Sequence, residues 1–284
     1  MAESTTPTTT PAAEAPPMPE LAEGTFRYRA LGEGRYVSTV HAQGAWNPHE
    51  QHMAPVTGLL VHELEQFQPR DDLRLARVSF DIHGLIHAGE FEVRTRMIRP
   101  GRTIELVEAE LVAGGRTAVV ARGWRMLTTD SRAVAGVEDE PLDPPEALEP
   151  FAGLQVWPGG FIRSLEIRTP TRRRPGRGAA WLRSEIPLLE DAEVSPLAHL
   201  ASLADTANGI VPRVDPGPES WAYPNLDLQL HLHRAPAGDW LGVDVRQTFG
   251  ADGVGLTSTV LHDEHGPFGR CEQILTLRAP RGTA

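Results

Sequence analysis

Asp205 is the side chain whose surroundings most favour chemistry. It lies near the end of a helix that the sequence predicts from Ser195 to about Ala207. The helix residues expected to face a sheet are apolar: Leu197, Leu200, Leu203 and Ala204. A carboxylate buried among such apolar side chains needs hydrogen bonds, and burial raises its pKa toward the working range of a general base. The plainer alternative is an aspartate that faces solvent at the helix end.

Gln273 is a second polar residue with apolar neighbours. On a predicted strand it shares one face with Cys271 and Leu275. If that face is buried, the amide needs partners, and Asp205 together with a bound water would supply them. An outward, solvated side chain agrees equally well with the sequence. Cys271 is the only cysteine, so we expect no intramolecular disulfide and interpret it as an inert core thiol.

The eleven histidines do not form a metal motif in the sequence. His49 and His52 are three positions apart, one short of the spacing that zinc proteases use on a helix. His231 and His233 share a strand face, where surface or interface roles are commoner, and residues 262–265 are most simply a polar turn. We therefore expect no metal.

The charged residues exclude several classes of function. Acidic residues outnumber basic ones by 38 to 27, a net charge of −11 that disfavours binding to nucleic acid. Every basic residue is arginine, so Schiff-base chemistry and a phosphate-loop lysine are excluded. No run of 18 apolar residues occurs, and the first twenty residues lack the features of a signal peptide. We expect a cytoplasmic protein with no membrane partner.

The elements that must position these residues repeat along the chain. After a tail at 1–22 that we expect to be disordered, a helix is predicted over Met53–Phe67. Four alternating runs follow, separated at hairpin spacing by glycine turns: 73–83, 90–98, 103–112 and 117–127. A stretch rich in proline and acidic residues, 134–155, is typical of a linker.

The same order returns beyond the linker. Two strand candidates, 161–168 and 181–189, precede the helix that carries Asp205. Four more strands are predicted after it: 225–233, 240–249, 254–262 and 269–278. An offset of 146 places Ser79 over Asn225 and the first helix over the second. Two copies of one α+β unit, at 23–133 and 156–282, are the simplest account.

A helix followed by an antiparallel sheet, duplicated in one chain, resembles the double hotdog fold of acyl-coenzyme A thioesterases. Short strings in the same order support the resemblance across about 25–280. They are Gly44 to Pro48 with Gln51-His52, Pro196 to Gly209, Asn225 to Leu228, His231 to Arg234, Gly253 to Leu256 and Gly269 to Gln273. The resemblance implies a tandem hotdog, each half a curved antiparallel sheet wrapped around a central helix.

The resemblance also implies a function and a site. In that family the second hotdog holds the hydrolytic water with Asp, Thr and Gln; here these positions are Asp205, Asn225 and Gln273, with Asn in place of Thr. No cofactor is implied, since coenzyme A is part of the substrate. Gln51 and His52, at the entry to the first helix, are then candidates for substrate binding. Arg172, Arg173 and Arg174 form either a solvated loop or a landing place for coenzyme A phosphates.

Two other functions remain open from the sequence. Enoyl-thioester hydratases of the hotdog class carry an aspartate before the Asn-Pro string, which Ala45-Trp46-Asn47-Pro48-His49 lacks, and a histidine that here comes one residue early. A protein that binds acyl thioesters without turning them over is the third candidate. For the thioesterase we expect an acyl-CoA or acyl-carrier substrate and a homodimer or tetramer. Acyl chain length and the carrier are not readable from the sequence.

Overall fold

A computed structural model of the chain describes residues 18–45, 47–169, 173–215, 217 and 219–280. The predicted tail at 1–22 therefore lies mostly outside the described residues. Ala22, at its end, donates its backbone N–H to Ser38 O at 2.9 Å. Among the described residues, no helix is long and apolar enough to span a membrane.

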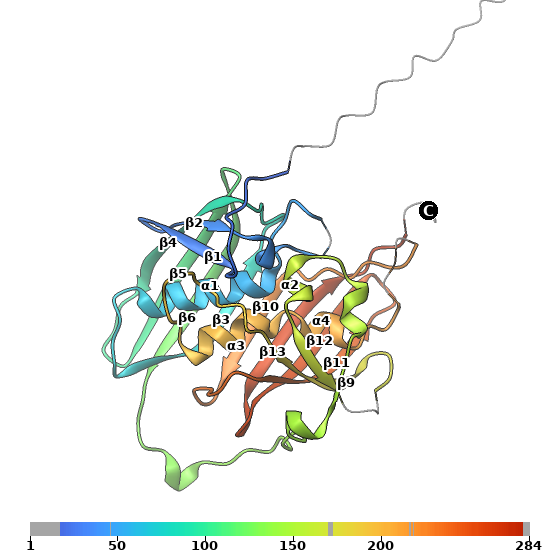
Figure 1. The fold of residues 1–284 in the computed structure, drawn as a ribbon. Coiled ribbons are helices and arrows are strands. Elements are labelled where there is room, and N and C mark those ends of the chain that lie inside the picture. The colour runs from blue at the N-terminus through green and yellow to red at the C-terminus, as the bar shows by residue number, and fades with distance from the viewer. Residues whose placement is uncertain (1–17, 46, 170–172, 216, 218, 281–284) are drawn as a thin grey trace, which may run out of the picture.

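One antiparallel sheet runs through the molecule and joins both halves of the chain (Figure 1). In sheet order its strands are β1 (Tyr28–Gly32), β2 (Arg35–Ser38), β4 (Glu90–Arg99), β5 (Ile104–Ala113), β6 (Arg116–Leu127), β3 (Leu73–Ile82), β10 (Asp227–Leu232), β13 (Gly266–Thr276), β12 (Val254–Asp263), β11 (Leu241–Phe249), β9 (Arg177–Arg183), β8 (Glu166–Thr169) and β7 (Glu149–Pro150). The strands of the first half are contiguous in this order, and β3 and β10 form the seam between the halves.

Two helices, one from each half, pack against each other in the middle of the molecule (Figure 1). They are α1 (Met53–Gln66) and α3 (Pro196–Ala204). Gly58 sets how closely they approach, because a Cβ added there would lie 2.4 Å from Ser202 Cβ. The sequence prediction of these two helices is confirmed, except that α3 ends at Ala204 and a short helix, α4 (Ala207–Ile210), follows.

The two helices run so that the start of each lies at the end of the other. Ser195, the N-cap of α3, accepts the N–H of Ala198 and donates to Glu65 in the last turns of α1 at 2.6 Å. His52, the N-cap of α1, lies against Asp205 at the end of α3. An approximate two-fold relation thus places one carboxylate at each helix start.

The sheet registers refine the internal repeat. Ser79 pairs with Arg122 in the first half, and Gln229 pairs with Glu272 in the second, so equivalent residues differ by 229 − 79 = 272 − 122 = 150. The offset of 146 predicted from the sequence is four residues too small for the strands. Ser79 and Gln229 also pair with each other across the seam, which puts the two-fold relation at that point.

The segment between the linker and α3 differs most from the prediction. The predicted strand 161–168 begins as a helical turn, α2 (Gly160–Arg163), and only its end joins β8. Gly159 has a φ of 108°, and a Cβ at Gly160 would lie 1.9 Å from Val40 O, so the chain turns tightly against the first half here. The strand predicted at 181–189 is β9, which lies earlier, at 177–183. Short 3-10 turns are η1 (Val40–Ala42), η2 (Arg132–Val134), η3 (Pro145–Ala147) and η4 (Gly153–Val156).

Candidate active site

The three residues predicted to hold a water lie together. Asp205 caps the end of α3 and is 8% exposed. Its Oδ1 accepts one hydrogen bond from Asn225 Nδ2 and another from Gln273 Nε2, both at 2.9 Å. Asn225 precedes β10, and Gln273 lies on β13 with no exposed surface. A helix end and two neighbouring strands thus bring together residues that are far apart in the sequence.

Burial changes the chemistry of Asp205. It raises the pKa of this carboxyl from 3.8 to about 6, and the hydrogen bonds from Asn225 and Gln273 oppose part of that increase by stabilising the charged form. A carboxylate with a pKa near 6 is ionised at neutral pH and still basic enough to take a proton during a reaction. The inward orientation expected from the apolar helix face is therefore the one observed.

His52 completes the surroundings of the carboxylate. Its Nδ1 accepts the backbone N–H of Ala54 at 3.1 Å and lies 3.4 Å from Asp205 Oδ2. Burial, and to a smaller extent the charge of Arg27, lowers the pKa of His52 to about 3, so the ring is neutral. Because Nδ1 is an acceptor toward Ala54, the ring proton belongs on Nε2. His52 is therefore neutral beside Asp205, and the single lone pair of its Nδ1 is already directed at the N–H of Ala54.

Arg27 is a buried cation beside this group, and no motif in the sequence marks it. Its guanidinium donates to His41 O and to Ser184 Oγ, both at 2.8 Å, and lies 4.6 Å from the centre of the Phe161 ring. The ring of His52 also packs against Phe161, with 4.5 Å between the ring centres. Burial lowers the pKa of Arg27 to about 10, which leaves it charged at neutral pH.

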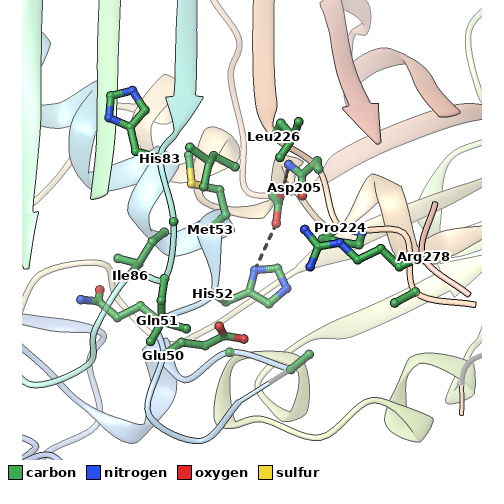
Figure 2. A pocket seen from close by; sticks show the side chains of 17 residues that line it. Glu50, Gln51, His52, Met53, His83, Ile86, Asp205, Pro224, Leu226 and Arg278 are labelled. Atoms are coloured by element: carbon green, nitrogen blue, oxygen red, sulfur yellow. Dashed lines mark hydrogen bonds and ion pairs between the residues drawn. The ribbon is translucent and has the colours of Figure 1, made fainter. Parts of the chain in front are cut away.

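A cavity of about 490 Å³ opens beside Asp205 (Figure 2). His52 points across it toward Asp205, and Arg278 extends into it from the opposite side to Met53 and Ile86. The exposed residues of its lining, His83, Gly84, Leu226 and Arg278, mark its mouth. Gln51 also lines it, but its Nε2 is bound to His87 O at 2.8 Å.

A smaller cavity of about 50 Å³ adjoins the large one at the same carboxylate. Four residues line both: Ala45, His52, Asp205 and Asn225. The rest of the small cavity is formed by Leu154, Trp157, Ile162, Thr206, Asn208, Gly209 and Tyr223. None of its lining residues is exposed. Asp205 therefore lies between the two cavities.

The first half of the chain does not carry an equivalent polar site. The offset of 150 places Gly123 opposite Gln273 and Leu75 opposite Asn225. A Cβ at Gly123 would lie 2.6 Å from Leu75 Cδ2 and 3.3 Å from Leu64 Cδ1, so aliphatic side chains fill that position. Glu65, the carboxylate at the other helix junction, is hydrogen-bonded by Ser195 and lines neither of the two cavities.

The predicted arginine loop lies away from these cavities. Arg172 is outside the described residues. The guanidinium of Arg173 stacks 3.7 Å from the centre of the Phe151 ring, and Arg174 is exposed at a turn closed by Arg177. Neither lines the cavity of Asp205, so a role in phosphate binding stays a prediction. Arg278, which does line its mouth, lies outside the arginine-rich stretch that the sequence indicates.

The remaining candidates take no part in this group. In the part of the chain that the structure describes, no three His, Cys, Asp or Glu side chains are grouped as metal ligands. Cys271 is fully buried, and burial raises the pKa of its thiol well above the usual value. His49 is not among the residues that line the cavity of Asp205.

Comparison with known families decides the membership of the chain. Residues 42–126 match the model of the acyl-CoA thioesterase N-terminal domain, and residues 140–277 match that of the acyl-CoA thioesterase C-terminal domain. The chain belongs to the acyl-CoA thioesterase family. No curated protein matches it at a significant level.

Solved structures that are named as thioesterases have a similar fold. A putative thioesterase II from Thermobifida fusca YX is 19% identical, with a TM-score of 0.69 over 89% of this chain and 96% of that one. A putative thioesterase from Novosphingobium aromaticivorans is 18% identical, with a TM-score of 0.68 over 89% and 98%. The acyl-CoA thioesterase II TesB2 of Mycobacterium marinum is 14% identical, with a TM-score of 0.65 over 92% and 98%. The predicted tandem hotdog fold is confirmed.

Proposed function

We propose that the protein hydrolyses acyl-CoA thioesters to a free acid and coenzyme A, with a water held by Asp205, Asn225 and Gln273. The observation that carries this proposal is the state of the buried carboxylate. Its Oδ1 is occupied by two amide donors, while Oδ2 faces a neutral histidine at the junction of two cavities. Membership of the acyl-CoA thioesterase family supports the same chemistry.

Asp205 is the general base in this proposal. As the oxygen of the water attacks the thioester carbonyl carbon, Oδ2 takes its proton; the C–S bond then breaks, and the proton passes to the leaving thiolate. Gln273 Oε1 is buried and lacks a hydrogen-bond partner among the described residues, so it is available to accept one from a water.

The start of α1 provides the positive potential that the reaction needs. Met53 is the first residue of this 14-residue helix and lines the large cavity. Its backbone N–H has no acceptor inside the helix, since the first N–H groups of any helix have none. It is therefore our candidate donor to the oxyanion, assisted by the positive end of the helix dipole.

The substrate phosphates would lie at the mouth of the large cavity. Arg278 is exposed there, and a guanidinium binds phosphate oxygens through paired hydrogen bonds. Arg173 and Arg174 are a second candidate group, as predicted from the sequence.

A thiol-release assay with a series of acyl-CoAs tests the function. A thiol reagent should report coenzyme A release by the wild-type protein, with no added metal. Protection of an acyl-CoA without turnover would instead indicate the non-catalytic binder. Loss of enoyl absorbance without thiol release would indicate the hydratase.

A further inference from the structure

The two cavities beside Asp205 differ in size and in the atoms that line them. The large cavity, of about 490 Å³, has a mainly apolar surface, to which Met53, Leu85 and Ile86 contribute. The small cavity, of about 50 Å³, presents more polar than apolar surface. A substrate with an acyl group and a long arm matches the large cavity, whereas the small one has the size and polarity of a site for water.

The small cavity meets both requirements of a water site. A buried water needs roughly 10–15 Å³ of accessible volume and about two to four polar partners, so there is room for about three to five water molecules. Asp205, Asn225 and Thr206 supply the partners. Asn225 uses its Nδ2 for the bonds to Asp205 Oδ1 and to Asp227 O, which leaves its Oδ1 to accept. Thr206 Oγ1 donates to Leu203 O and keeps its lone pairs.

The wall of the small cavity around Gly209 is held firmly in place. The preceding residue, Asn208, accepts hydrogen bonds at its Oδ1 from Gln247 Nε2 at 3.0 Å and from Thr257 Oγ1 at 3.2 Å. These bonds fix α4 against β11 and β12. A Cβ added at Gly209 would meet Trp157 Nε1 at 3.7 Å, an ordinary contact. A side chain at this position would therefore reduce the cavity without a backbone clash.

The proposed reaction distinguishes the two sides of the carboxylate. Met53, whose backbone N–H is our candidate donor to the oxyanion, lines the large cavity and not the small one. The thioester carbonyl therefore belongs on the side of the large cavity, where bound substrate excludes water from Asp205. Trp157 and Asn208, in the lining of the small cavity, are half-buried, so water can exchange with solvent on that side.

We propose that the small cavity is the water site of the enzyme and supplies the nucleophile, while the substrate occupies the large cavity. This rests on the proposed thioester hydrolysis. Each turnover consumes one water, whose oxygen forms the new C–O bond as the C–S bond breaks; its proton passes through Asp205 to the leaving thiolate. The next water then moves from the small cavity to Asp205. Gly209 keeps this space open because it has no side chain.

Competition between water and methanol tests the proposal. Methanol attacks in the same way, forms a methyl ester and gives its proton through Asp205 to the thiolate. Gly209→Val adds methyl groups to the small cavity, so the ratio of ester to acid should fall by about tenfold or more, since one excess methylene is worth about 10–200-fold in a close-fitting pocket. The kcat for hydrolysis should also fall, with KM nearly constant. An unchanged kcat and an unchanged ratio would overturn the proposal.

A matched variant on the other side of the carboxylate provides the control. Leu85→Trp adds bulk to the large cavity, so it should raise KM for acyl-CoA and leave the ratio of ester to acid unchanged. The ratio reports only on active molecules, so partial misfolding of either variant does not alter it. A ratio changed by Leu85→Trp and not by Gly209→Val would mean that water arrives through the large cavity, and the proposal would be wrong.

Crystal structures separate the water site from the hydrolysis itself. The wild-type protein would be crystallised alone and with a ketone analogue of acyl-CoA, in which a CH₂ group replaces the thioester sulfur and prevents hydrolysis. Ordered waters in the small cavity, lost in Gly209→Val, would support the water site even where the wild-type protein releases no thiol and the proposed function fails. Analogue atoms in the small cavity, or no ordered water there, would refute it.

Discussion

The buried carboxylate should reduce the stability of the folded chain, so replacing Asp205 with Asn should inactivate the protein and stabilise it. In the folded chain the pKa of Asp205 is about 6, whereas an exposed aspartate has 3.8. Each pKa unit corresponds to about 1.4 kcal/mol, so ionisation of this group costs the folded state up to about 3 kcal/mol at neutral pH. Because the folded state binds the proton more tightly, this cost is present above pH 6 and is relieved as the pH falls toward 4.

Asparagine fits the same hydrogen bonds without the charge. Its Oδ1 can accept from Asn225 and Gln273, and its neutral Nδ2 takes the place of the charged Oδ2 beside the ring of His52. The variant should therefore gain up to about 3 kcal/mol in the free energy of unfolding at pH 7.5, with the gain vanishing near pH 4. Its kcat should fall by about 10²–10⁴-fold, the usual contribution of a general base.

Chemical denaturation at a series of pH values and the thiol-release assay measure both effects. Asp71→Asn is the matched control, because it removes the same charge from an exposed position outside the cavity. Near wild-type turnover by Asp205→Asn would refute the general base. A stability gain that does not depend on pH, or that Asp71→Asn reproduces, would refute the electrostatic reasoning.

Three further expectations concern titration, phosphate binding and helix packing. The kcat/KM profile should rise with pH through about 6, as Asp205 ionises. Gln273→Ala should move this rise to higher pH, because the variant lacks the N–H donor that stabilises the ionised carboxylate. A rise at the same pH in that variant would contradict this reasoning. Arg278→Ala should raise KM for acyl-CoA by about tenfold with kcat nearly constant, and an unchanged KM would remove Arg278 from the phosphate site. Arg173→Ala and Arg174→Ala test the predicted arginine loop in the same assay. Gly58→Ala should lower the free energy of unfolding by about 1–3 kcal/mol, because its Cβ would lie 2.4 Å from Ser202 Cβ. Gly136→Ala is the control, since a Cβ at Gly136 meets no atom within 4 Å. Equal stability of the two variants would contradict the close helix packing.

The sequence by itself determined the repeated order of elements. Apolar periodicity and glycine turns predicted α1 and the long hairpin strands to within a few residues, because such signals are local. It also indicated that Asp205 would be buried, since the helix around it is apolar. The offset between the repeats was less accurate because the lengths of the loops are not encoded in the pattern of either strand.

The tertiary structure decided which residues share the site. Asp205, Asn225 and Gln273 meet only because a helix end is packed over two neighbouring strands. Their joint assignment from the sequence came from the family resemblance and not from their spacing. The position of the neutral His52 ring beside Asp205, and the buried charge of Arg27, depend on contacts between the two halves of the chain. The division of space around the carboxylate also depends on how Trp157 packs over α4, far away in the sequence from Asn225. Contacts of this kind arise from the packing of distant segments, for which a single sequence carries no local signal.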